Sequence, residues 1–150
     1  MIAGKPTKKD YIFVIIQVLL FVVYVAPIQI IAIDLSEWLR YLGLIVAVLG
    51  FIFGGIALLQ INTKLSPFPT PISGAKLLTN GTYAIARHPI YTSILAITLG
   101  YAVYEASVFK FIIFLALGFL FYFKSIYEEQ LLMNTFPEYS TYKTKTRRFI

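Results

Sequence analysis

The feature that most constrains this chain is a run of uncharged residues from 11 to 33. The run is 23 residues long, and a helix needs about 20 apolar residues to cross a bilayer. Three further apolar runs follow, at about 38–61, 83–104 and 106–127. Only 13% of the residues are charged, against roughly a quarter in average soluble domains. The sequence therefore predicts one all-α integral membrane domain, residues 1–150, with four transmembrane helices.

Basic residues indicate how these helices are oriented. Eleven of the thirteen lysines and arginines lie in the N-terminus, in the 62–88 loop or from residue 124 onward, and the other two are Arg40 and Lys110. Because cytoplasmic loops carry the excess of Lys and Arg, the N- and C-termini and the long loop are predicted to be cytoplasmic. We expect the plasma (inner) membrane of a prokaryote. The net charge of +6 then indicates contact with the lipid bilayer, with no nucleic-acid partner.

Small residues predict a close helix contact in the second apolar run. Gly50 and Gly54 are four residues apart, so one helix face is bare of side chains and lets another helix approach. This face packs either within the chain or between two copies in a homodimer. The sequence leaves both arrangements open.

The only histidine marks the first candidate site. His88 lies between Arg87 and Pro89, with Tyr83 and Tyr91 close by. Proline is favoured at the first helical position, so His88 is expected near a helix start, where free N–H groups can hold an anion. Whether that helix begins at Tyr83 or at Pro89 stays open. The alternative reading is an interfacial anchor with an aromatic belt.

A second polar cluster, Glu128-Glu129, follows the last apolar run. The short connection at Glu105 makes the two preceding helices antiparallel neighbours, so His88 and the glutamates are expected at one membrane face. We predict a cytoplasmic-face pocket built from the 62–91 loop and helix start and the C-terminal segment 128–150. Adjacent helical residues point about 100° apart, so only one glutamate faces the pocket squarely. With no cysteine and one histidine, we expect no metal site.

Three segments resemble a known family. They are residues 77–83 (Leu-Leu-Thr-Asn-Gly-Thr-Tyr), residues 87–91 (Arg-His-Pro-Ile-Tyr), and Glu128-Glu129 followed by Leu131, Leu132, Phe136, Tyr139 and Tyr142. Together they resemble the isoprenylcysteine carboxyl methyltransferase family, part of a wider group of integral membrane methyltransferases that includes phospholipid methyltransferases. The resemblance covers about half of the chain. One departure is Ser93, where the family commonly has glycine.

The resemblance implies S-adenosyl-L-methionine as the cofactor. It implies methyl transfer to a lipophilic or small hydrophobic acceptor, which is a carboxylate, an amine or a thiol. The expected cofactor-binding residues are Lys76, Leu77, Leu78, Tyr83, Arg87, His88, Pro89, Ile90, Tyr91 and Glu129. The expected catalytic residues are His88, Glu128 and Glu129, and Lys124 is the expected substrate contact. An amine or thiol acceptor must lose a proton, for which His88 or a glutamate is the available base.

A second function stays open beside this one. A non-enzymatic membrane protein could bind anionic lipid headgroups through Arg87, Lys124 and the basic C-terminal tail. A transporter has less support, because the sequence shows no internal repeat and no charge in the middle of a span.

Overall fold

The structure is a computed structural model that describes residues 5–61, 66–72 and 74–150. This part of the chain is helical and contains no strand, which confirms the all-α prediction for it. Its helices are α1 (Lys8–Tyr24), α2 (Glu37–Ile61), α3 (Thr82–Ile85), α4 (Pro89–Tyr104), α5 (Val108–Thr135) and α6 (Tyr139–Lys145).

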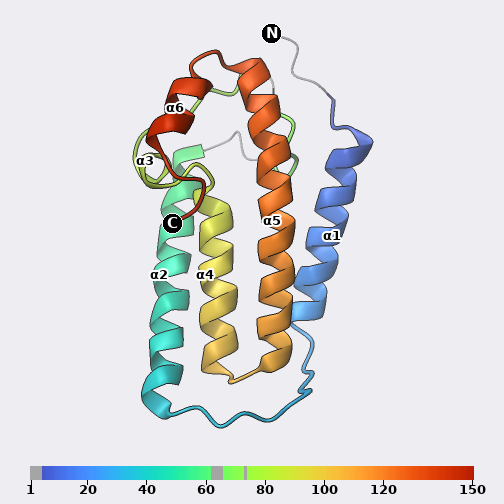
Figure 1. The fold of residues 1–150 in the computed structure, drawn as a ribbon, viewed down its shortest axis with the longest axis vertical. Helices are drawn as coiled ribbons and strands as arrows, with labels where there is room; N and C mark the ends of the chain where they lie inside the picture. The colour runs from blue at the N-terminus through green and yellow to red at the C-terminus, as the bar shows by residue number, and fades with distance from the viewer. Residues whose placement is uncertain (1–4, 62–65, 73) are drawn as a thin grey trace.

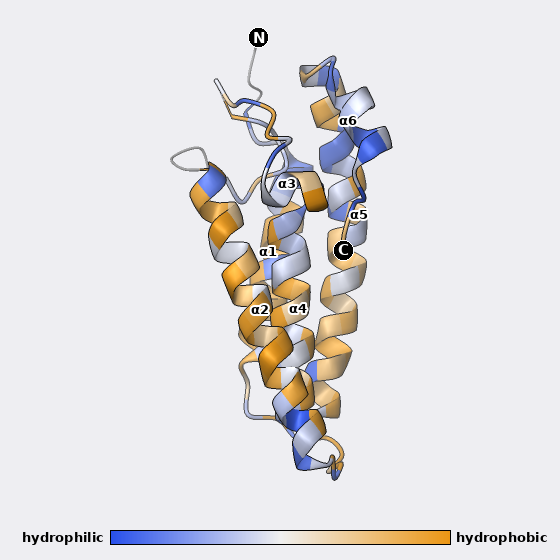
Figure 2. Cartoon of the chain, turned by 90° about the vertical axis from the view of Figure 1, so that its left-hand side faces the viewer, coloured by the Kyte–Doolittle hydropathy of each residue, from blue (hydrophilic) through white to orange (hydrophobic). Residues whose placement is uncertain are grey.

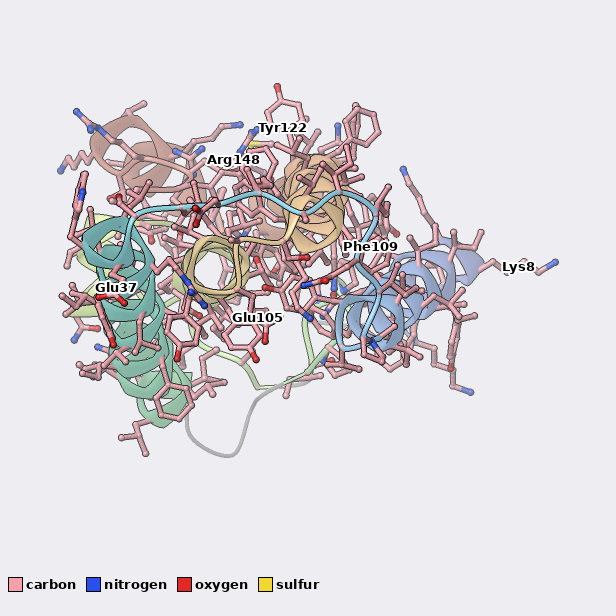
Figure 3. The ribbon with its side chains drawn as sticks, turned by 90° about the horizontal axis from the view of Figure 1, so that it is seen from below. Lys8, Glu37, Glu105, Phe109, Tyr122 and Arg148 are labelled. Carbon is pink, nitrogen blue, oxygen red and sulfur yellow. The ribbon has the colours of Figure 1, made fainter. Side chains whose placement is uncertain are left out.

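The four long helices lie side by side in one curved row. Helix α2 packs on α4, α4 on α5, and α5 on α1, an order seen from the side in Figure 1 and end-on in Figure 3. The short helices α3 and α6 lie at one end of the row, together with the start of α1. The α1–α2 and α4–α5 connections lie at the opposite end. The segments that carry most of the basic residues therefore share one end of the molecule.

Two of the four long helices have the length and surface that a lipid environment requires. Among the described residues, α2 and α5 are long and apolar enough to cross a membrane, and α4 is a shorter apolar helix. Large apolar side chains cover their outer faces: Leu59 is 82% exposed and Phe51 is 72% exposed. Figure 2 shows hydrophobic residues along the helices and hydrophilic residues gathered towards both ends. The count of four spans and their orientation in the membrane remain predictions.

The first predicted span, 11–33, is wrong at its outer end. Helix α1 begins with a capping box, in which Thr7 and Asp10 satisfy each other's backbone N–H groups, and it ends at Tyr24. Pro27 follows three residues later, and the residue before a proline is driven out of the helical region. The proline therefore ends this helix rather than kinking it, and α1 is 17 residues long.

Helix α5 extends beyond the inner end of the last predicted span, 106–127. Helix α5 continues without a break to Thr135, because the sequence offers no glycine or proline after residue 118 until Pro137. Glu128 and Glu129 therefore belong to the same rigid helix as the apolar run before them.

The third predicted span, 83–104, is divided in two. Residues 82–85 form the separate short helix α3, and α4 starts at Pro89. Of the two alternatives that the sequence left open, the start at Pro89 is the observed one.

The glycine face of α2 packs within the chain. Gly50 and Gly54 are buried and face Ala96 and Ser93 of α4. A Cβ added at Gly50 would lie 2.8 Å from the Ala96 Cβ, which is too close for carbon atoms. Of the two arrangements that the sequence left open for this face, the structure shows packing within the chain, against α4. Ser93, the departure from the family pattern, is accommodated by Gly54.

Candidate functional site

The site begins where α4 starts. Pro89 lies in its first turn and His88 is the N-cap residue, the placement that proline favours. The C-terminal tail runs beside this start. The backbone N–H of Arg87 donates to the Arg147 carbonyl at 2.8 Å, and the N–H of His88 donates to the carbonyl of Arg148 at 3.1 Å. The His88 N–H, which was expected to hold an anion, is thus used within the protein.

A buried carboxylate, Glu129, gathers the cations near this helix start. Its side chain is 1% exposed. Three basic atoms pair with it: Arg87 Nη2 at 2.9 Å, Arg148 Nε at 2.9 Å and Lys143 Nζ at 3.3 Å. His88 Nε2 lies 3.3 Å from Glu129 Oε1. Because charge-assisted bonds of this kind are strong and directional, they hold Glu129 in a fixed orientation between α4, α5 and the tail.

The adjacent carboxylate, Glu128, has different partners. The Tyr91 hydroxyl donates to Glu128 Oε2 at 2.9 Å, and His88 Nδ1 lies 3.6 Å from the same oxygen. The His88 ring stacks on Tyr91 with centroids 5.3 Å apart. His88 therefore lies between the two glutamates. The side chain of Glu128 is 25% exposed, so it is the glutamate that a bound molecule can reach.

A cavity of about 410 Å³ adjoins Glu128, a volume within the range of small-molecule sites. Its wall comes from the end of α2, the loop between α2 and α3, the segment leading to α4, and the α5–α6 region. The charged lining residues are Lys76, Arg87 and Glu128, and the aromatic ones are Phe68, Tyr83, Phe136, Tyr139 and Tyr142. Leucines and prolines supply much of the rest. The wall thus combines one carboxylate with two cations, aromatic rings and aliphatic surface.

Gln60, in the last turn of α2, positions one side of the cavity. Its Oε1 accepts hydrogen bonds from the backbone N–H of Thr82 at 3.0 Å and from the Thr82 hydroxyl. Gly81 makes this possible: its φ is +60°, and a Cβ there would collide with the Gln60 side chain. The contact fixes the start of α3 and with it Tyr83 at the cavity wall.

An aromatic cluster forms the opposite side. Phe136, Tyr139 and Tyr142 are buried together, with Leu77 and Leu132 packed against them. Burial raises the pKa of Tyr142 to about 12, so its phenol stays protonated and donates to the backbone carbonyl of Tyr83. This bond ties α6 to α3 across the cavity.

The predicted site residues divide into two groups of equal size. Lys76, Leu77, Leu78, Tyr83, Arg87 and Glu128 line the cavity, whereas His88, Pro89, Ile90, Tyr91, Lys124 and Glu129 lie outside its described wall. His88 and Tyr91 contact Glu128, and Glu129 binds Arg87. These three residues therefore support the residues that line the cavity. The predicted pocket also included residues 62–65 and 73, which lie outside the described part of the chain.

Lys124 has an enclosed environment. It is 1% exposed, and its Nζ donates to Gln17 Oε1 at 2.7 Å and to the Pro67 carbonyl at 3.0 Å. The ammonium also lies 5.3 Å from the centroid of the Tyr91 ring. Lys124 thus connects α5 to α1 and to the loop after α2, and its contact with a methyl acceptor stays a prediction.

The sequence match to a known family agrees with this geometry. A model of the phospholipid methyltransferase family matches residues 38–139, about two thirds of the chain. The chain belongs to this family. Because the phospholipid methyltransferases fall within the integral membrane methyltransferase group, the resemblance seen in the sequence is confirmed. No curated protein matches the sequence significantly.

Family membership and the apolar helices α2 and α5 together identify a membrane protein. The matched region of this phospholipid methyltransferase family member runs from the start of α2 to the start of α6. It includes the glycine contact, the start of α4 and both glutamates. The tail that supplies Arg148 lies beyond it.

Several residues of the site were not expected from the sequence. Gln60, Lys143 and Arg148 contact it, and Tyr139 and Tyr142 line the cavity. The two tyrosines had a usable signal, because their spacing of three places them on one face of a helix. No sequence signal marked Gln60, since its role depends on the loop after α2 bringing Thr82 next to it.

Proposed function

We propose that this member of the phospholipid methyltransferase family transfers the methyl group of S-adenosyl-L-methionine to a lipophilic or small hydrophobic acceptor. The observation that carries the proposal is the cavity of about 410 Å³ beside Glu128, within a chain that belongs to a methyltransferase family. The cofactor would supply an electrophilic methyl group on its sulfonium.

The residues of the cavity fit such a cofactor. Tyr83 and the leucines at 77 and 78 offer flat and aliphatic surface to an adenosine group, and Glu128 offers a negative charge to an ammonium or sulfonium. Tyr91 holds the Glu128 carboxylate in place through its hydroxyl. Lys76 and Arg87 give the same wall positive charge for a carboxylate.

Among the three acceptor classes, we propose one that must lose a proton, an amine or a thiol. Glu128 is the carboxylate on the described cavity wall, with His88 Nδ1 3.6 Å from its Oε2. These two residues form a pair in which Glu128 takes the proton and His88 shares it. Glu129 acts as a positioning residue, because Arg87, Arg148 and Lys143 bind its oxygens.

We further propose that the cavity faces the cytoplasm at the inner membrane of a prokaryote. The support is the concentration of basic residues at the end of the molecule where the cavity lies. The acceptor would then reach the cavity from the lipid that surrounds α2 and α5.

The first test is calorimetric titration of S-adenosylhomocysteine into the detergent-purified protein. We expect micromolar binding, and we expect Glu128→Gln to weaken it about tenfold, the loss typical of a charge-assisted contact. Glu138→Gln is the matched control, since Glu138 is exposed and does not line the cavity. Transfer of a labelled methyl group to amine, carboxylate or thiol lipids then identifies the acceptor class.

A folded protein that binds no S-adenosylhomocysteine would contradict the proposal and favour the alternative, a lipid-headgroup binding protein. The structure gives that alternative less support, because Arg87 and Lys124 both bind protein groups. In the basic tail, Lys145 and Arg147 are exposed and are the residues that remain available for headgroup binding.

A further inference from the structure

Two tyrosines of α6, Tyr139 and Tyr142, line the cavity, and only one of their hydroxyl groups has a hydrogen-bond partner within the described residues. Tyr142 donates its hydroxyl to the carbonyl of Tyr83. The hydroxyl of Tyr139 is buried and has no hydrogen-bond partner within the described residues, and the whole side chain is 1% exposed. Most buried hydroxyls in native proteins are paired. An unpaired one at the wall of a cavity indicates that its partner is a molecule that enters the cavity.

The charge near Tyr139 indicates which kind of atom that partner has. Burial raises the pKa of Tyr139, and Glu129 and Glu128 add to this while Arg87 opposes it. The phenol therefore remains an O–H donor and needs an oxygen acceptor. Glu128 and Glu129 carry two negative charges against the four positive charges of Lys76, Arg87, Lys143 and Arg148. The group as a whole is positive, which favours an anionic oxygen beside it.

We propose that the Tyr139 hydroxyl binds the carboxylate of the molecule held in the cavity. This inference rests on the proposed function, in which that carboxylate belongs to the amino-acid part of S-adenosylmethionine. Neither the glutamates nor the histidine can replace Tyr139 here, because a carboxylate repels an anion and His88 lies outside the described wall. Tyr139 is then a cofactor-binding residue.

The test compares two ligands in two matched variants. S-Adenosylhomocysteine carries the carboxylate, and 5′-methylthioadenosine lacks the amino-acid part but keeps the adenosine. We expect Tyr139→Phe to weaken S-adenosylhomocysteine binding about tenfold and to leave 5′-methylthioadenosine binding unchanged. Tyr142→Phe controls for the loss of a cavity hydroxyl that is already paired within the protein.

Thermal unfolding without ligand gives an independent measurement. Removing an unpaired hydroxyl leaves no broken bond, so Tyr139→Phe is expected to keep or raise the unfolding midpoint by about 2 °C. Tyr142→Phe breaks the bond to Tyr83 and is expected to lower the midpoint by about 2–4 °C.

Three results would overturn the inference. Unchanged S-adenosylhomocysteine affinity in Tyr139→Phe would overturn it while leaving the proposed function intact. Equal weakening of both ligands would assign the hydroxyl to the adenosine instead. If the wild-type protein binds 5′-methylthioadenosine and S-adenosylhomocysteine equally poorly, the proposed function fails together with the inference, which separates this case from the other two.

Discussion

Glu129 is a buried carboxylate on which the local structure depends. It binds Arg87, Arg148 and Lys143 and lies 3.3 Å from His88. Glu129→Gln would leave these cations without their common counter-charge, and breaking a buried ion pair costs about 3–5 kcal/mol. We therefore expect a large fall in the thermal unfolding midpoint of the detergent-purified protein.

The adjacent glutamate provides the control for this prediction. Glu128→Gln removes the same charge from a 25% exposed side chain, which contacts Tyr91 and His88. Glu128→Gln should change the free energy of unfolding by less than about 1 kcal/mol while weakening ligand binding. Equal destabilisation by the two variants would show that Glu129 has no special structural role.

The α2–α4 contact depends on the absence of side chains on one face of α2. A Cβ at Gly50 would lie 2.8 Å from the Ala96 Cβ and 3.1 Å from the Ser93 carbonyl oxygen, whereas a Cβ at Gly55 would meet nothing within 4 Å. Gly50→Ala should therefore destabilise the protein by about 1–3 kcal/mol through overpacking. Gly55→Ala should be neutral or stabilise it by up to about 1 kcal/mol, since alanine is the better helix former.

Chemical or thermal unfolding in one detergent distinguishes these two variants. If Gly55→Ala destabilised the protein as much as Gly50→Ala, the effect would come from the helix itself. The close packing of α2 on α4 would then not explain it.

At the scale of the whole molecule, Asp10 links α1 to the loop between α2 and α3. Asp10 is fully buried, and it accepts hydrogen bonds from the backbone N–H of Thr70 at 3.2 Å and from the Thr70 hydroxyl at 2.8 Å. Burial alone would raise the pKa of Asp10, but hydrogen bonds from Thr7 and Thr70 outweigh it and lower the pKa below the ordinary value of 3.8. Asp10 thus joins the first helix to a residue that lines the cavity.

This link predicts a dependence of stability on pH. A lowered folded-state pKa means that the Asp10 contribution is complete above about pH 4 and is lost as the pH falls through the folded value. Asp10→Asn should destabilise the protein by about 1–3 kcal/mol at neutral pH, and its difference from wild type should shrink on acidification. Unfolding midpoints measured from pH 7 down to pH 3 test this, and a difference that grows below pH 4 would contradict it.

Much of the fold follows from local sequence properties. Apolar runs predicted α2 to within one residue at its start, and Pro89 marked the start of α4, because hydrophobic length and proline geometry act within a few residues. The end of α1 was predicted wrongly, and α5 extends beyond the predicted span. Helix α1 ends at Tyr24 because Pro27 disfavours helix there, although the run of uncharged residues continues to residue 33. At Thr135 helix propensity carries α5 past the end of the apolar segment.

By itself, the sequence determined the helical class, the methyltransferase resemblance, and the shared end for His88 and the two glutamates. Which glutamate lines the cavity was decided only by the tertiary structure, because Glu128 and Glu129 differ solely in the direction that α5 gives them. The tertiary structure alone also decided that Arg148 binds Glu129 and that Tyr139 lines the cavity. The tail and α6 return to the start of α4 through backbone bonds to Arg87 and His88, and contacts between residues so far apart depend on the packing of the whole chain.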